Sequence, residues 1–324
     1  MQKPNTSNSK QRGIALIIFA LILVVAATSF FVSQLGSNDI KIERDKKTAA
    51  AMAEAKNALL GWSVLQGKPG QLPCPEDTTL IGSVNEGSAL ANCNSALPVV
   101  GRLPWRTLGL GDLRDGNADR LWYALSTGFS DATMPINSGT TGQINVNGTS
   151  NVVAIIFSPG VILAGQNRPP PTNTLPPAVT DYLDLTNNDG DVNFSSTGPT
   201  ATFDDRLLLV TQSDLFNLVS RRILRELRGD TTQGLVSFYN ANSNYPFADT
   251  NADGIADAGE LGIAPVGTPS YGGINNTDPN DLFLNPTIKN MLISNNWMPL
   301  IHYQILANRQ TVTMTLSGQT LNVP

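Results

Sequence analysis

Apolar residues are distributed very unevenly along the chain. Residues 1–13 are polar and basic, whereas residues 14–32 contain only two polar side chains, Thr28 and Ser29. A helix needs about 20 consecutive apolar residues to cross the hydrocarbon core of a bilayer. The pattern therefore predicts a helix that starts at Ile14 and whose first part, residues 14–35, spans a membrane.

The predicted helix continues well beyond the apolar run. Residues 36–38 (Gly-Ser-Asn) are only a weak break, and no proline lies between Pro4 and Pro69. After a charged stretch, apolar residues recur at steps of three or four, which places them on one helix face. These residues are Met52, Ala55, Leu59 and Trp62. We predict one long transmembrane and amphipathic helix over 14–66, roughly 80 Å long at about 1.5 Å per residue.

The rest of the chain carries the signals of short strands joined by turns. Asn147-Gly148 is a hairpin-type turn, and it separates two expected strands at 143–146 and 152–157. Further strands are expected at 121–126 and 206–210. The predicted fold class is α+β, with an antiparallel sheet in the globular part.

A second amphipathic helix is expected directly after the last of these strands. Thr211 or Ser213 can cap its first turn, and its apolar pattern ends near Arg228. Its other face carries a basic cluster, which we interpret as a solvated face whose last members favour the helix dipole. The cluster consists of Arg221, Arg222, Arg225 and Arg228.

Composition narrows the classes of function. The formal net charge is −5 and charged residues make up 15% of the chain, so a basic surface for nucleic acid is not expected. His302 is the one histidine, which excludes His-rich metal centres. No recognised catalytic motif is present, and we expect no enzyme. Two carboxylate pairs, Asp112 with Asp115 and Asp204 with Asp205, are expected to be exposed turn residues.

The two cysteines, Cys74 and Cys93, lie in a loop rich in Gly, Ser and Asn. An even cysteine count in an exported chain indicates a disulfide. Two free buried thiols are the alternative. A zinc site is disfavoured because no histidine lies nearby.

Residues 249–260 (DTNADGIADAGE) fit the twelve-residue calcium-loop template. Calcium takes six to eight oxygen ligands, a glycine at the sixth position allows the sharp turn, and a final glutamate can bind through both oxygens. The expected ligands are Asp249, Asn251, Asp253, Asp257 and Glu260 through their side chains, and Ile255 through its carbonyl. The flanking residues are not helical, so the loop resembles the calcium turns of extracellular repeat proteins. A loop without metal is the alternative.

Three interpretations of the N-terminal segment remain open. It can be a secretory signal peptide cut after Ala27, an uncleaved signal anchor, or a prepilin-type segment. Residues 10–13 (Lys-Gln-Arg-Gly), followed at once by the apolar run, resemble a prepilin cleavage site with Gly13 at the cut and Ile14 as the first mature residue. The long helix resembles the first helix of type IV pilins and pseudopilins.

Short motifs later in the chain resemble a group of prepilin-like proteins of Gram-negative bacteria. They include Leu103-Pro104-Trp105, the segment 155–160 and the segment 204–207. One departure is informative, because most pilins carry Glu at the fifth mature position and this chain carries Ile18. The departure resembles minor pseudopilins and favours a minor or capping subunit.

The resemblance implies a leader at 1–13 and the long helix at 14–66. A candidate internal repeat, in which Pro73 and Pro246 lie 173 residues apart, divides the rest into two pilin-like modules at 67–205 and 206–324; chance similarity of short motifs is the alternative. The resemblance also implies an assembly subunit of a type IV pilus or type II secretion filament, held in the inner membrane with its body in the periplasm or on the filament. The implied partners are other pilins, prepilin peptidase and the inner membrane. A surface-displayed adhesive head and a membrane-anchored periplasmic enzyme are the alternatives.

Overall fold

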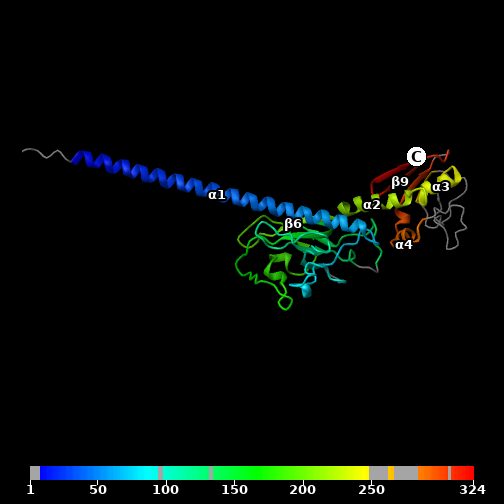
Figure 1. Cartoon of the computed structure of the whole chain (residues 1–324), viewed down its shortest axis with the longest axis horizontal. Coiled ribbons are helices and arrows are strands. Elements are labelled where there is room, and N and C mark those ends of the chain that lie inside the picture. Colours follow the sequence, from blue (N-terminus) through cyan, green and yellow to red (C-terminus); the bar gives the residue numbers. More distant parts are fainter. Residues whose placement is uncertain (1–7, 94–97, 131–133, 248–261, 266–283, 306–307) are drawn as a thin grey trace, which may run out of the picture.

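The computed structural model describes residues 8–93, 98–130, 134–247, 262–265, 284–305 and 308–324, and the fold is α+β (Figure 1). The α-helices of this part are α1 (Asn8–Leu65), α2 (Gln212–Arg228), α3 (Gly234–Asn242) and α4 (Pro286–Ser294). The first sheet contains β1 (Val99–Arg102), β2 (Trp122–Leu125), β3 (Ile144–Val146), β4 (Thr149–Ser158), β5 (Asn193–Phe194) and β6 (Arg206–Thr211). The second contains β7 (Gly262–Pro265), β8 (His302–Ile305), β9 (Val312–Leu316) and β10 (Gln319–Val323).

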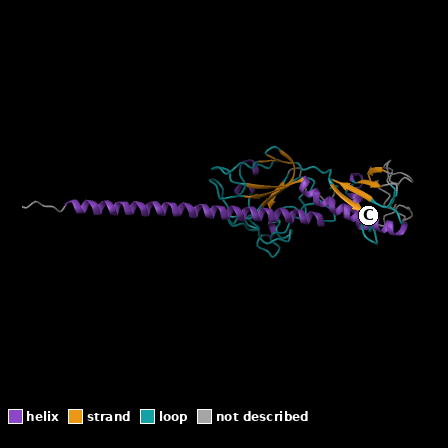
Figure 2. Ribbon diagram, turned by 90° about the horizontal axis from the view of Figure 1, so that it is seen from above, coloured by secondary structure: helices purple, strands orange, loops and turns teal. Residues whose placement is uncertain are grey.

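Helix α1 is continuous over 58 residues, or about 87 Å at 1.5 Å per residue. Residues 36–38 do not interrupt it, since one glycine inside a helix costs only about 1 kcal/mol. Figures 1 and 2 show that its N-terminal part extends away from the rest of the protein, while its C-terminal part lies along the first sheet. We call the rest of the protein, after α1, the body.

The prediction of a transmembrane helix is wrong for the described residues. Within the residues that the structure describes, no helix has both the length and the apolar character needed to cross a membrane. The described side chains of α1 include a charged stretch from Asp39 to Lys47. Within the predicted span 14–35 the structure describes only the side chains of Leu23 and Val24, so the described part of α1 lacks the run of about 20 apolar residues that a spanning helix needs.

The first sheet is built around β4. Strands β2 and β6 flank β4 on opposite sides and both run antiparallel to it, while β1 extends the sheet beyond β2. β3 and β4 form the predicted hairpin, with positive φ angles of 48° at Asn147 and 83° at Gly148. Two consecutive positive φ angles match the right-handed twist of the paired strands. The strand and hairpin predictions for this region are confirmed.

The two faces of this sheet pack against different layers. Tyr123, Leu125 and Ile156 point to a core shared with α1 and α2. Trp122 and Phe157 point to the opposite side, where they join a second core under the segment 179–194. Alternate residues of a strand point to opposite faces, so the central strands are buried on both.

Helix α2 connects the two sheets. Thr211 caps it through a capping box with Asp214, which confirms the predicted start. Its apolar face packs on the first sheet at one end and near β9 and β10 at the other. The ring of Phe216 lies 5.9 Å from that of Trp297, so one apolar core continues from the first sheet to the second.

Cys74 and Cys93 form a disulfide, as the cysteine count predicted. The bridge closes the loop that precedes β1, and Cys74 is buried. This loop is poor in regular structure, and a cross-link of this span restricts the unfolded chain.

Candidate functional site: the seam between the long helix and the body

Helix α1 lies on the body through a face of small and apolar residues. Ala55 and Leu59 are fully buried at this contact. Ala51, Met52 and Leu60 are also buried, whereas the residues on the opposite face, such as Glu54, are exposed. Helix α1 contacts β4, β6 and α2 along this line. We call this contact the seam; small side chains at its centre let the helix backbone approach the body closely.

The closest approach is made by Gly116, in the turn before β2. A Cβ atom placed on Gly116 would lie 2.2 Å from the carbonyl oxygen of Arg44 in α1. The backbone N–H of Gly116 donates to Oγ1 of Thr48, one turn further along α1, at 2.9 Å. Thr48 is buried, so this hydrogen bond is shielded from water. Glycine is therefore required here by space rather than by backbone conformation.

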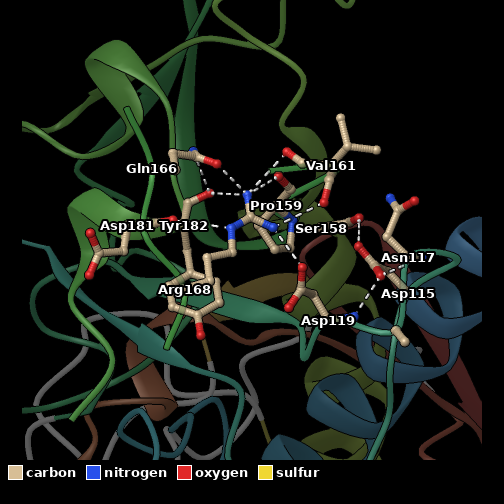
Figure 3. A network of polar contacts seen from close by, with 12 residues as sticks. Asp115, Asn117, Asp119, Ser158, Pro159, Val161, Gln166, Arg168, Asp181 and Tyr182 are labelled. Atoms are coloured by element: carbon tan, nitrogen blue, oxygen red, sulfur yellow. Dashed lines mark hydrogen bonds and ion pairs between the residues drawn. The ribbon is translucent and has the colours of Figure 1, made fainter. Parts of the chain in front are cut away.

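The turn that carries Gly116 is held by the buried carboxylate of Asp115. Its Oδ1 accepts hydrogen bonds from the backbone N–H groups of Asn117 and Asp119, at 2.8 and 3.0 Å. Its Oδ2 accepts from Oγ of Ser158, the last residue of β4, at 2.6 Å (Figure 3). The turn is thus tied to the central strand of the sheet, and the prediction of an exposed carboxylate at Asp115 is wrong.

The next member of the network is Arg168, whose side chain is 2% exposed. Its guanidinium pairs with Oδ2 of Asp119 at 2.6 Å and stacks at 5.1 Å over the ring of Tyr182. It also donates to Oε1 of Gln166 at 2.7 Å. Further acceptors are the backbone carbonyls of Pro159, Gly160, Val161, Asp181 and Tyr182 (Figure 3). One arginine therefore joins the long 159–182 loop to the turn that holds α1.

Ion pairs reinforce both ends of the seam. Lys56 of α1 pairs with Asp214 at 2.9 Å and donates to the carbonyl of Leu209 at 2.8 Å. Although partial burial raises it, the pKa of Asp214 is lowered overall, because Lys56 and Thr211 hydrogen-bond to the carboxylate. Near the start of the seam, Arg206 pairs with Asp45.

The C-terminal end of α1 is capped by an arginine from α2. Arg222 donates to the carbonyl oxygens of Val64 and Gln66, which have no acceptor role left inside the helix. The sequence placed Arg222 on a solvated face, because the pattern of one helix cannot show that another helix ends beside it.

A groove of about 670 Å³ runs beside α1 at the seam. Arg44 and Asp45 of α1 line one wall, and Asp204 and Asp205 line the other. Asp205 is buried, accepts from the backbone N–H of Asp184 and from Nδ2 of Asn187, and has no described partner for its Oδ1. Burial raises the pKa of Asp205 to about 7. The prediction of an exposed carboxylate is wrong here too.

The described side chains of the seam include none of the predicted cleavage or calcium residues. Gly13 and Ile14 belong to the extended part of α1, and their surroundings lie outside the described residues. The calcium-loop residues 249–260 also lie outside the described part. In the part of the chain that is described, no group of three acidic, histidine or cysteine side chains is placed to hold a metal ion. His302 is exposed on β8.

Comparison with models of known families, with characterised proteins and with solved structures finds no match for this chain. Its function therefore has to be inferred from its own residues and geometry.

Adding one methyl group at the closest approach should loosen the seam. We expect Gly116→Ala to lower the free energy of unfolding by about 1–3 kcal/mol, because the new Cβ overlaps the Arg44 backbone and the helix must shift. Gly111→Ala is the matched control, since a Cβ there meets nothing within 4 Å. Urea unfolding of both variants measures the difference, and equal midpoints would show that the contact is unimportant.

The buried carboxyl of Asp205 should give the protein a specific dependence on pH. Its pKa is about 7 when folded, against roughly 4 in an unfolded chain, so the folded state holds one more proton between these values. The stability it contributes is complete below about pH 4 and is lost as the pH rises through about 7. We therefore expect Asp205→Asn to gain stability relative to the natural protein between pH 5 and pH 8.

This expectation is checked by urea unfolding at both pH values. Glu54→Gln, at an exposed position on α1, is the control and should show no such change in relative stability. An Asp205→Asn variant whose stability relative to the natural protein is the same at both pH values would contradict the burial argument.

Proposed function

We propose that this protein is an assembly subunit of a filament of the type IV pilus or type II secretion kind, in which long helices of neighbouring subunits pack side by side. The observation that carries this proposal is the asymmetry of α1. Its C-terminal part is clamped on the body by the seam, whereas its N-terminal part extends beyond the body (Figure 2).

The extended part of α1 has the composition of a helix whose side chains are normally removed from water. Residues 14–32 are almost entirely apolar, and Leu23 is 56% exposed in the single chain. Each large apolar side chain that moves from water into a packed contact contributes about 1.5–3 kcal/mol. A run of such residues on one helix therefore favours association with the equivalent helices of other subunits.

The seam supports this role because it fixes the direction of the helix. A continuous α-helix is stiff, so holding its C-terminal part also fixes the direction of its N-terminal part. The C-terminal part is held by close packing at Gly116, by ion pairs and by the Arg222 cap. The body would then occupy a defined place in an assembly built from helices. A flexible joint would not give that order.

The N-terminal residues support the same proposal from the sequence side. The basic segment that ends in Gly13 resembles the pattern on which a prepilin peptidase acts, and the apolar run begins immediately after it. Ile18 stands where major pilins carry Glu, which favours a minor or capping place in the filament.

The mature protein isolated from the cell that produces it should begin at Ile14. Intact-mass measurement checks this directly, because removal of residues 1–13 changes the mass by a defined amount. A chain that begins at Met1 would contradict processing by a prepilin peptidase, and one that begins at Thr28 would indicate a signal peptide.

A charge in the extended part of α1 should weaken association. Leu23→Glu is expected to reduce the affinity between subunits at least about tenfold, because a buried unpaired carboxylate is costly in an apolar contact. Val84→Glu is the matched control, since Val84 is an exposed aliphatic residue of the body. Sedimentation velocity over a range of concentrations measures both. Equal association of the two variants would contradict helix-mediated assembly.

A further inference from the structure

A second cavity, of about 310 Å³, lies in the body and is separate from the groove beside α1. Its lining is unusually rich in arginine: Arg102, Arg114, Arg120 and Arg168. Glu86 and Asp119 are the acidic residues of the lining, and Tyr182 with the proline run 169–171 supplies the less polar wall. These residues come from separate segments of the chain, so only folding brings them together.

Three of the four arginines are fully engaged within the body. Arg168 holds the loop network described above. Arg120 pairs with Asp112 at 2.8 Å and with Glu86, and Arg114 pairs with Asp112 at 2.8 Å. The pKa of Asp112 is lowered overall despite its partial burial, because both guanidinium groups hydrogen-bond to it.

Arg102, the last residue of β1, differs from the other three. Its side chain is 5% exposed, yet its Nε and Nη1 atoms have no hydrogen-bond partner among the described residues. Its nearest counter-ion is Glu76, with Nη1 and Oε2 separated by 3.8 Å, and that oxygen also lacks a partner. Burial raises the pKa of Glu76, although the charges of Arg102 and Arg120 act in the opposite direction.

A buried guanidinium with so weak a pairing is costly, because its Nε and Nη1 atoms have lost their hydration without gaining a hydrogen bond within the described part of the chain. Arg102 lines the cavity, so a negative group that enters the cavity comes within Coulomb range of its charge. We propose that this cavity is a binding site for a carboxylate group, with Arg102 as its main electrostatic partner.

The charges around the cavity restrict the ligand. Four arginines face four carboxylates in and behind the lining, namely Glu76, Glu86, Asp112 and Asp119. Because positive and negative groups are equal in number, Glu86 and Asp119 repel every added negative charge. One added charge beside Arg102 is therefore less unfavourable than two. A carboxylate therefore fits better than a phosphate, which carries nearly two charges at neutral pH.

Tyr182 gives the site its shape. Its ring lies 5.1 Å from the guanidinium of Arg168 and 5.9 Å from that of Arg102. Its contact with Trp122, at 5.1 Å between ring centres, holds it against the second core. A small carboxylate, or the carboxylate end of a peptide, would have a rigid wall beside the charged group.

The test uses the full chain and four probes in calorimetric titrations. The probes are acetate, the dipeptide N-acetyl-Ala-Ala with a free carboxylate, the same dipeptide as its C-terminal amide, and inorganic phosphate. We expect the free dipeptide to bind at least about tenfold more tightly than its amide and than phosphate. Acetate distinguishes the sources: equal binding of acetate indicates a free small carboxylate, and binding of the dipeptide alone indicates a peptide end.

Arg102→Gln should reduce the affinity for the free dipeptide at least about tenfold, whereas Arg106→Gln, at an exposed arginine outside the cavity, should leave it unchanged. If Arg102→Gln does not fold, Arg102→Lys keeps the charge without the planar fork and should retain part of the affinity. Equal binding of the dipeptide and its amide, tighter binding of phosphate, no binding of either carboxylate, or unchanged affinity in the folded Arg102→Gln variant would overturn the proposal.

Discussion

The close packing of α1 on the body is the constraint on which the rest of the structure depends. The body covers only the C-terminal part of this 58-residue helix, along one face of small and apolar residues. Ala55 and Leu59 are fully buried in that face, and Gly116 brings the body's backbone against that of α1. The hydrogen bonds of Asp115 and Arg168 hold the turn that carries Gly116 in place.

Polar groups around the seam are buried in pairs or chains, because an isolated one would be too costly. Asp115, Ser158, Asp119 and Arg168 form one connected set, in which nearly every donor meets an acceptor. Several side chains, such as those of Asp204 and Glu76, have buried atoms that lack a described partner, and Asp205 and Arg102 are two of them. We infer pH dependence at Asp205 and ligand binding at Arg102. At each position a buried group is incompletely paired, so binding a proton or a ligand there lowers the free energy of the folded protein.

Much of the regular structure could be predicted because its signals are local. The Asn147-Gly148 hairpin, the strand at Arg206 and the Thr211 cap each depend on neighbouring residues, and the cysteine count indicated the Cys74–Cys93 disulfide. The α+β class follows from these elements. The transmembrane prediction failed on the described residues of α1, because their side chains do not include a run of about 20 apolar residues.

The sequence by itself determined the hairpin at Asn147-Gly148, strand β6, helix α2, the amphipathic face of α1, and the basic segment that ends at Gly13. Only the tertiary structure decided which partners the buried charged residues have. These residues are Arg222 at the end of α1, Asp115 in the turn that packs on α1, Arg168 in the loop network and Arg102 in the cavity. The physical reason is that periodicity and turn chemistry act between residues close in sequence. A buried ion pair or a carbonyl cap depends on which distant segments fold against each other.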